Sequence, residues 1–526
     1  GYIDMVLTDY QNTDTATYQG NVNLENFNLG KFINDPRVGR TSMDFDVNGQ
    51  GFIQEFLDTK LSGIIYNITY NDYTYKDITV FGDLKNPVFN GEIIINDSNL
   101  QAKVDGLIDV SKSINSYDFE ADITYANLVN LKFVKDSVSV LKGNVIMDMK
   151  GTGIEDAFGR LSFSDAVYQN KNDTYYFKDF DVTSVFDDKN IRTIAINSSD
   201  IIDGSVSGNF KFNEVVPLFR NALGSLYTNY QPEILTEDQF MDFDFTINNK
   251  IVEVFVPEIE FEPETIIKGS VVSNDSEFKL TFKSPRIEAF GNMAEAIEVK
   301  VDNKNPLFNT YIAADSIDAG FYAVSDFNLI NVTLKDTLFM KSEFSGGTRN
   351  DDRYDLSLYH TINEDGNSVV GFKKSKVVFK DNDWFINEEN NQRNRIVFDN
   401  NFKDLDIETI ALSHKDERID LKGVLRDSIY KDIKAQFTNV DLAKITPVIE
   451  NLDLKGRVNG KLDVLQKEGA YYPNSTVAID GFTVNEYLLG KFDLTVEGNT
   501  SLSTYKVKSK LENQEGAPLV AEGDII

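Results

Sequence analysis

The 526-residue sequence has no cysteine, and its only two histidines are His360 and His414. A chain without thiols forms no disulfide, has no cysteine nucleophile and binds no zinc through cysteine, and the lack of stray thiols favours an exported protein. Two histidines leave little material for a zinc site or a Ser–His catalytic centre. Neither has a carboxylate at a typical spacing, so we expect both to be polar surface residues and the chain not to be an enzyme.

Basic residues are scarce as well, with 52 Lys+Arg against 84 Asp+Glu and a net charge of −32. This balance argues against binding to nucleic acid, whose affinity comes from basic side chains that release counterions. It also argues against docking on an anionic membrane surface, and we interpret the acidity as a source of solubility. Only 11 prolines occur, so no segment resembles a proline-rich linker.

Long apolar runs are missing too: no stretch approaches the roughly 18 residues of a membrane span, and no signal peptide is present. The sequence begins at Gly1 rather than Met and stops inside an expected strand, residues 520–526. We therefore expect a stretch of a longer chain, with any membrane anchor outside it. At 526 residues the chain exceeds one hydrophobic core, so it forms several domains or one elongated array.

The dominant pattern is strict alternation of apolar and polar residues, as in Met241–Asn248, where Phe243 and Phe245 alternate with Asp242 and Asp244. Such alternation predicts strands with one dry and one wet face. At about 12 residues per strand and turn, the chain has room for roughly 40 strands. The predicted fold class is all-β, an elongated repeat-built β-groove of antiparallel-type strands with a few short helices.

One segment has helical periodicity, because its apolar residues from Val215 to Leu226 recur every three to four positions. We expect Asn213 to be its N-cap and Gly224 to mark its last turn, and we expect the helix to cover a core or cap a groove. Shorter helical turns are expected at Leu128–Phe133 and Asp441–Ile445.

An internal repeat of about a hundred residues is visible in four markers at one offset. Gly49-Gln-Gly51 matches Gly151-Thr-Gly153, and three further pairs follow: Tyr75–Ile78 with Phe177–Phe180, Ile95–Ser98 with Ile196–Ser199, and Gly106 with Gly208. A second phrase, an Asn/Leu turn before a Gly-started strand, begins at Asn28, at Asn127 and, as Asp-Leu, at Asp441. We expect one continuous groove segment over 1–526, with approximate repeats 1–110, 111–212, 213–345, 346–450 and 451–526.

Other features carry little chemistry. Asp351-Asp352 and Asp381–Asp383 lack the closing Glu of a calcium loop and are interpreted as hairpin turns. The two Gly-x-Gly phrases lack a following phosphate-binding helix and are interpreted as repeat turns. The single tryptophan, Trp384, in a strand between turns, indicates no particular site. We expect no cofactor and no metal.

Three phrases, Ala478–Gly498, Asn26–Ile33 and Ser98–Ser111, resemble the TamB family and more broadly the AsmA-like and bridge-like lipid-transfer proteins. The Tyr/Asn/Asp-rich composition resembles a Bacteroidota version. The resemblance implies a long, twisted, taco-shaped β-groove in the periplasm, with an inner-membrane anchor at one end and a BamA- or TamA-like outer-membrane barrel at the other. It further implies phospholipid transport between the two membranes, or the assembly of outer-membrane proteins, and no catalytic residues.

The residues alone support a trough, because a sheet with one apolar face must curl, stack or close in water. If it curls without closing, its inward side chains line a trough sized for phospholipid acyl chains. The residues we expect to line it are Phe119, Ile123, Phe210, Phe212, Phe243, Phe245, Ile247, Phe278, Leu280, Phe282, Leu462, Val464, Phe492, Leu494 and Val496.

Two other classes of protein share the strand pattern. A rod of tandem β-sandwich modules fits a hundred-residue repeat, but such modules should show linkers and buried tryptophan. An outer-membrane β-barrel needs aromatic girdles at fixed heights, and hundred-residue repeats are not expected in it. The sequence does not separate a lipid conduit from an assembly factor for outer-membrane proteins.

Overall fold

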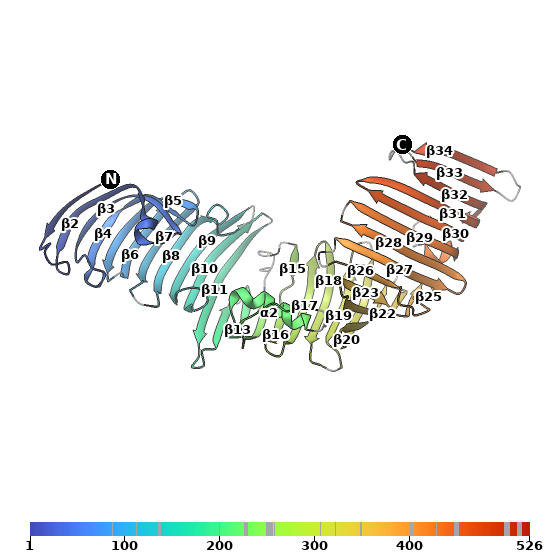
Figure 1. Cartoon of the computed structure of the whole chain (residues 1–526), viewed down its shortest axis with the longest axis horizontal. Coiled ribbons are helices and arrows are strands. Elements are labelled where there is room, and N and C mark those ends of the chain that lie inside the picture. Colours follow the sequence, from blue (N-terminus) through green and yellow to red (C-terminus); the bar gives the residue numbers. More distant parts are fainter. Residues whose placement is uncertain are drawn as a thin grey trace. The chain divides into compact units, whose positions relative to one another are not determined.

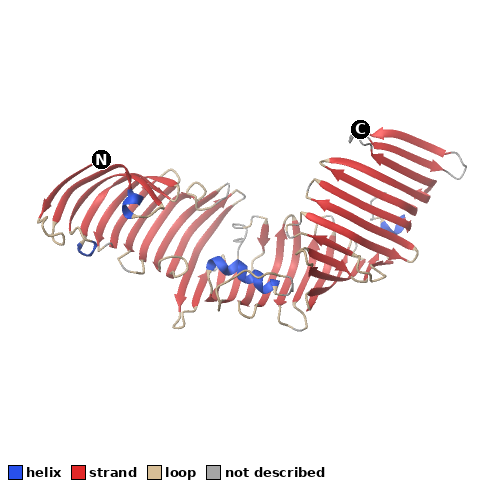
Figure 2. Cartoon of the chain, in the orientation of Figure 1, coloured by secondary structure: helices blue, strands red, loops and turns tan. Residues whose placement is uncertain are grey.

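The computed structural model describes residues 1–86, 88–111, 113–134, 138–171, 173–198, 200–225, 230–248, 256, 258–305, 307–320, 322–347, 350–399, 401, 403–427, 429–446, 452–498, 505–512 and 518–525. These residues contain 34 strands of one antiparallel sheet and a few short helices, which confirms the predicted all-β class (Figure 2). Long alternating strands joined by short turns produce this arrangement, since most strands pair with their neighbour along the chain, whereas β14–β16, β15–β17, β22–β24, β23–β26 and β25–β27 pair across intervening strands.

The chain divides into two compact units. Unit 1 comprises residues 1–213 and 239–268, and unit 2 comprises residues 214–238 and 269–526 (Figure 1). The strands of unit 1 are β1 (Tyr2–Thr8), β2 (Thr17–Asn28), β3 (Val38–Gln50), β4 (Asp58–Tyr70), β5 (Tyr73–Lys85), β6 (Val88–Asn96), β7 (Leu100–Asp109), β8 (Ser116–Asn127), β9 (Ser139–Lys150), β10 (Phe158–Asn170), β11 (Thr174–Phe186), β12 (Arg192–Asn197), β13 (Ile202–Asn209), β14 (Phe240–Ile247) and β15 (Ile259–Phe261). The unit boundary falls within β16 (Thr265–Val272).

Unit 2 holds the remaining strands. They are β17 (Glu277–Ala289), β18 (Asn292–Asp302), β19 (Thr310–Asp318), β20 (Ala323–Leu334), β21 (Thr337–Gly346), β22 (Asp352–Ile362), β23 (Ser368–Phe372), β24 (Ser375–Phe379), β25 (Asn382–Ile386), β26 (Arg395–Phe398), β27 (Asp404–His414), β28 (Glu417–Arg426), β29 (Tyr430–Asp441), β30 (Leu454–Lys467), β31 (Ala470–Val484), β32 (Tyr487–Gly498), β33 (Tyr505–Glu512) and β34 (Pro518–Ile525).

The hundred-residue repeat corresponds to a group of strands in unit 1. Strands β3 to β7 and strands β9 to β13 follow one another in the same order, and each sequence marker lies on or directly after the corresponding strand of the two groups. Gly49 is still in β3 and Gly51 follows that strand, whereas Gly151 and Gly153 both follow β9, so the second Gly-x-Gly phrase lies two residues further into the turn that leads to the next strand. The five repeat boundaries named above remain a prediction.

The Asn/Leu phrases share one structure. Each follows a strand whose pairing is interrupted by a β-bulge just before its end, in β2, β8 and β29. A side-chain oxygen then caps the turn: Asn28 accepts from the Lys31 N–H at 3.1 Å, Asn127 from Asn130 at 3.0 Å, and Asp441 from Ala443 at 3.1 Å. The bulge bends the strand end and the cap stabilises the turn that reverses it.

The short helices are α1 (Leu29–Ile33), α2 (Val215–Gly224) and α4 (Leu442–Ile445), with 3₁₀ turns η1 (Gln54–Phe56) and η2 (Phe212–Glu214). Helix α2 begins and ends where the periodicity predicts, except that Leu226 lies outside the described residues. Its N-cap is Glu214, without a side-chain cap, and the prediction of Asn213 was wrong because that residue lies in η2. A helical turn forms at 442–445 as predicted, whereas residues 128–133 form only turns.

Candidate functional site: the apolar face of the sheet

Strand register places the apolar residues of unit 1 on one face of the sheet. One row of cross-strand partners runs through fourteen strands without a polar side chain: Met5, Gly20, Val47, Leu61, Gly82, Gly91, Gly106, Phe119, Met147, Leu161, Val182, Ile196, Gly204 and Phe245. Because side chains alternate between faces, the residues two positions away in each strand lie on the same side. The result is a continuous apolar surface from β1 to β14.

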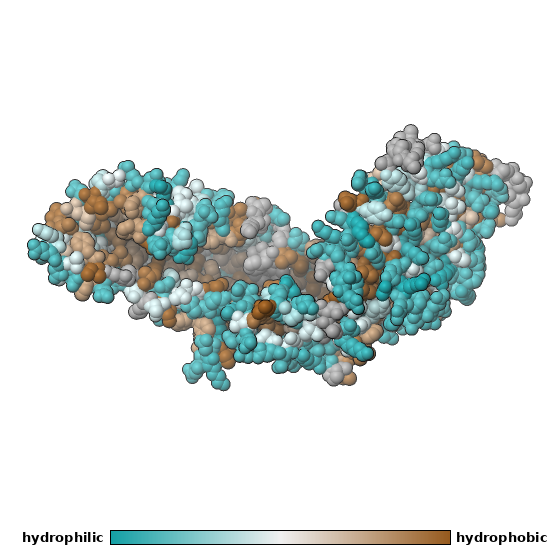
Figure 3. Space-filling model, viewed as in Figure 1, coloured by the Kyte–Doolittle hydropathy of each residue, from teal (hydrophilic) through white to brown (hydrophobic). Residues whose placement is uncertain are grey.

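Most of this surface is only half-buried. Val80, Ala121 and Val145 are 7–9% exposed, but most of their inward neighbours, Phe119 and Phe245 among them, keep larger fractions in contact with solvent. Side chains between two packed sheets would be almost fully covered. In Figure 3 the hydrophobic surface of unit 1 lines a hollow whose edges are hydrophilic.

Two glycines of the row lie next to its two aromatic residues. An added Cβ at Gly204 would lie 2.7 Å from the Cδ1 of Phe245, and one at Gly106 would lie 2.6 Å from the Cβ of Phe119. The ring of Phe245 therefore extends over the position where a Gly204 side chain would stand. Each aromatic side chain thus adds apolar surface, while the neighbouring glycine leaves room for the ring to lie flat against the sheet.

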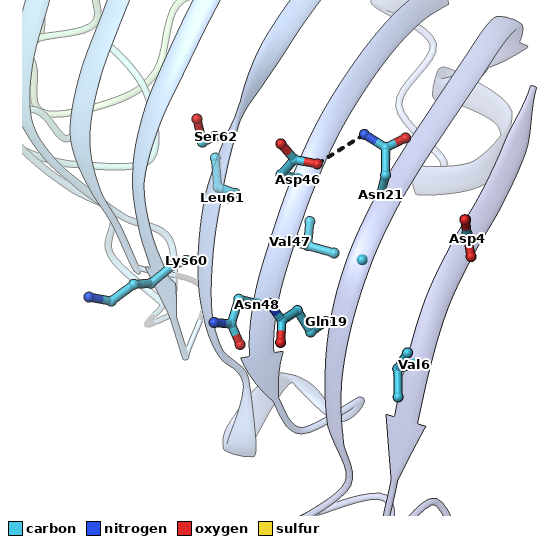
Figure 4. A pocket seen from close by; sticks show the side chains of 11 residues that line it. Asp4, Val6, Gln19, Asn21, Asp46, Val47, Asn48, Lys60, Leu61 and Ser62 are labelled. Atoms are coloured by element: carbon cyan, nitrogen blue, oxygen red, sulfur yellow. Dashed lines mark hydrogen bonds between the residues drawn. The ribbon is translucent and has the colours of Figure 1, made fainter.

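The other face of unit 1 is polar. Asp242 and Asp244 are exposed on β14, and Asp244 forms an ion pair with Lys268 at 2.6 Å. The same face carries a hollow of about 650 Å³ over β1–β4, in which Asn21 donates a hydrogen bond to Asp46 at 3.1 Å (Figure 4). Seven of its eleven lining residues are polar or charged: Asp4, Gln19, Asn21, Asp46, Asn48, Lys60 and Ser62.

The structure places thirteen of the fifteen predicted lining residues on strands. In unit 1, Phe119 and Ile123 share one face of β8, and Phe243, Phe245 and Ile247 share one face of β14. In unit 2, each of three strands carries its predicted residues at alternating positions of one face: Phe278, Leu280 and Phe282 on β17, Leu462 and Val464 on β30, and Phe492, Leu494 and Val496 on β32.

Their exposure differs along the chain of unit 2. Phe278 is 5% exposed because Phe219 of α2 packs edge-on against it, with ring centroids 5.5 Å apart. Leu462 and Val464 are each 40% exposed. Helix α2 therefore covers the beginning of β17, whereas the part of β30 around Leu462 and Val464 is open to solvent.

Phe210 and Phe212 do not lie in a strand, contrary to the alternation that suggested it. Phe210 follows β13, Phe212 belongs to η2, and their rings meet edge-on at 5.6 Å. The Arg192 guanidinium lies 4.9 Å from the centre of the Phe212 ring and donates to the carbonyls of Ile154 at 2.9 Å and Ala157 at 2.8 Å. Arg192 is a buried cation on the inward face, and burial lowers its pKa. It holds the β9–β10 turn in place.

The expectation that both histidines lie at the surface was wrong for His414, which is 6% exposed, with its Nδ1 2.6 Å from the Asp383 carbonyl oxygen. His360 lies on the inward face of β22 opposite Leu338 and Val370, and burial lowers its pKa. Alternation alone could have placed His360 on the apolar face, since Leu356 and Leu358 precede it at the same parity.

A buried cluster in unit 2 was missed in the sequence. Trp384 is 3% exposed and packs with Val377, Val440, Val458 and Ile479, and Leu442 and Ile445 of α4 rest against them. Next to it, the Glu417 carboxylate is 1% exposed, forms an ion pair with Lys444 and accepts a hydrogen bond from the Asp441 N–H at 2.8 Å. Helix α4 is thereby fixed on the apolar side of its strands.

Among the described residues there is no group of three or more acidic, histidine or cysteine side chains that could hold a metal ion. No helix in that part of the chain is both long and apolar enough to cross a bilayer. Comparison with known proteins finds no match to a family model, to a curated protein or to a solved structure. Geometry and chemistry of the apolar face are therefore the basis for assigning a function.

Proposed function

We propose that the apolar face is a trough for phospholipid acyl chains, and that the chain is a periplasmic, TamB-like conduit for phospholipids between the inner and outer membranes. The partners in this proposal are the acyl chains themselves, an inner-membrane anchor, and a BamA- or TamA-like outer-membrane barrel. The resemblance of Ala478–Gly498 and two further phrases to TamB supplies the cellular setting.

One observation carries the proposal: the fourteen-strand apolar row of unit 1 is continuous and half-exposed. Soluble proteins seldom leave a contiguous apolar surface larger than a few hundred Å² in water, and larger ones mark binding sites. A surface that extends through fourteen strands, at about 4.8 Å per strand, is long enough for an extended acyl chain of any common length. An apolar ligand with a long axis fits it better than a compact one.

The uniformity of the lining favours movement over storage. Each buried methylene of a lipid contributes about 0.8 kcal/mol, wherever along the row it lies. Because the row consists only of Gly, Met, Val, Leu, Ile and Phe, no polar or charged side chain divides the lining into separate sites. The polar head group can remain in water above the open face.

A rod of β-sandwich modules fits the structure less well. Sandwich modules bury the apolar face of one sheet against a second sheet, at a spacing of about 10 Å. In unit 1 strands β1 to β14 pair in sequence within a single sheet, and most of their inward side chains are half-exposed. The apolar face therefore lacks the facing layer that a sandwich requires.

Mass spectrometry of lipids that co-purify with the chain tests the proposal. We expect phospholipids at a stoichiometry of at least one per chain, removable by detergent and restored by incubation with phospholipid vesicles. A chain that carries no lipid and takes up none from vesicles would contradict it.

A further inference from the structure

Four exposed apolar side chains stand in corresponding turns of the two repeat copies in unit 1. On one rim, the turns after β2 and β8 carry Phe32, 76% exposed, and Phe133, 65% exposed, each preceded by a lysine. On the opposite rim, the glycine turns after β3 and β9 carry Phe52, 52% exposed, and Ile154, 66% exposed. Single exposed apolar residues are common, but their recurrence at matching places of both rims requires a reason.

These side chains stand on anchored backbone. Side-chain caps from Asn28 and Asn127 hold the turns of one rim. On the other rim, the Gly51 N–H donates to the Ala16 carbonyl at 2.9 Å and the Phe52 N–H donates to the Thr13 carbonyl at 2.9 Å. In the second copy, the Arg192 guanidinium holds the Ile154 carbonyl at 2.9 Å. The backbone hydrogen bonds therefore fix the positions of these apolar residues relative to the sheet at both rims.

In the first copy, the rim aromatics touch the inward face directly. The Phe32 ring meets the Phe27 ring edge-on at 5.8 Å, and Phe27 pairs with the fully buried Thr41 on the inward side of β3. At the other end of the same strands, the Phe52 ring stacks on Tyr18 with centroids 5.1 Å apart, and Tyr18 is 7% exposed. The exposed rings thus extend the inward apolar surface upward at both rims.

The third capped turn, which begins at Asp441, has the same order of residues but is packed against the apolar side of its strands. Asp441, Leu442, Lys444 and Ile445 match Asn28, Leu29, Lys31 and Phe32 of the first copy in order. In unit 2, Ile445 packs against the buried cluster around Trp384, and the Lys444–Glu417 ion pair holds the turn there. This type of turn is therefore able to cover the apolar side of its strands.

We propose that Phe32, Phe133, Phe52 and Ile154 cover an acyl chain that lies in the trough of unit 1, so that they retain a lipid that the floor alone would release. The inference rests on the proposed lipid function and adds the residues that shield the chain from water on its open side. The four side chains are exposed, and an acyl chain in the trough would give them apolar surface to pack against.

The test replaces all four rim residues by serine and measures retention of a phosphatidylethanolamine that carries a fluorescent label on one acyl chain. The loaded full chain is mixed with unlabelled phosphatidylethanolamine/phosphatidylglycerol vesicles, and transfer of the label is followed. We expect at least tenfold faster release from the rim variant, the change that corresponds to loss of about one well-buried apolar contact. Its thermal unfolding should match that of the parent, since the side chains removed are mostly exposed.

A matched control replaces four exposed apolar residues of the polar face, Ile64, Phe81, Ile146 and Val185, by serine. Their exposed fractions of 40%, 46%, 48% and 55% are somewhat lower than those of the rim residues, and register directs them away from the trough. We expect their release rate to stay within about twofold of the parent.

The outcomes separate the two proposals. Failure of the parent chain to take up any label would contradict the proposed function itself. Uptake by the parent with equal release from parent and rim variant, or an equal effect of the control set, would overturn the role of the rims alone. Unchanged release combined with loss of vesicle flotation or of self-association in sedimentation would assign the rims to a bilayer or to a second copy, and would also overturn it.

Discussion

Replacement of Phe119 by Asp places one carboxylate in the middle of the apolar row of unit 1, between Gly106 and Met147. A fully buried Phe side chain contributes about 1.5–3 kcal/mol, and Phe119 is half-buried, so the lost burial amounts to about 1–1.5 kcal/mol. Because the face is open, water reaches the new carboxylate, and the free energy of unfolding should fall by about 1–2 kcal/mol. The same substitution in a closed core leaves an unpaired buried charge and would cost more than about 4 kcal/mol.

The cost of the carboxylate rises when an acyl chain passes it, because hydrocarbon displaces water from the charged group. If dehydration adds only about 3 kcal/mol to the barrier, lipid movement past Phe119→Asp slows by about a hundredfold. Phe81→Asp is the matched control, since it makes the same change on the polar face at a residue that is 46% exposed. Transfer of labelled phospholipid from donor to acceptor vesicles gives the rate, and thermal unfolding followed by circular dichroism gives the stability. Equal transfer by Phe119→Asp and Phe81→Asp, or a Phe119→Asp chain that does not fold, would refute an open apolar trough.

Three further predictions concern stability. Gly106→Ala should lower the free energy of unfolding of unit 1 by about 2–4 kcal/mol, because φ is +150° and the new Cβ would lie 2.3 Å from the Asp118 carbonyl oxygen. Gly153→Ala, whose new Cβ would have no atom within 4 Å, should change that free energy by less than about 0.5 kcal/mol. Hydrogen exchange of unit 1 amides would show the difference, and equal protection in the two variants would contradict it. Lys444→Met should destabilise unit 2 by about 3 kcal/mol, because it leaves the buried Glu417 carboxylate without its cation, and the double variant with Glu417→Gln should recover more than half of that loss. Trp384 is the single tryptophan and belongs to the cluster against which α4 packs, so its fluorescence reports the urea midpoint. A single variant as stable as the parent would count against the buried charge. Burial holds the pKa of His360 below its ordinary value of 6.5, so the unfolded chain binds the proton first. Stability should therefore fall as pH drops from 6.5 until the lower folded-state pKa is passed. His360→Leu should remove that part of the pH dependence of the urea midpoint measured by Trp384 fluorescence, and an unchanged pH profile would contradict it.

Local patterns in the sequence account for the strands and their faces. Alternation around Phe119 and Phe245 identified the inward residues because a strand's side-chain period of two is a local property that neighbours cannot change. The capped turns at Asn28, Asn127 and Asp441 were visible for the same reason, since a cap involves residues only two or three positions apart. Where the local signal was ambiguous the prediction failed, as at Phe210 and Phe212, whose spacing suits a strand although they occupy a turn.

The sequence by itself determined that this protein is an all-β chain with one apolar and one polar face, built in unit 1 from a hundred-residue repeat. Only the tertiary structure decided which parts of the apolar face are covered: α2 lies on Phe278, α4 on the strands around Trp384, and the row from Met5 to Phe245 stays half-exposed. The burial of His414 and Glu417 and the division into two units were likewise decided there. The physical reason is that coverage depends on contacts between residues far apart in the chain, such as Lys380 with the Ala443 carbonyl at 3.0 Å, and these leave no periodic trace in the sequence.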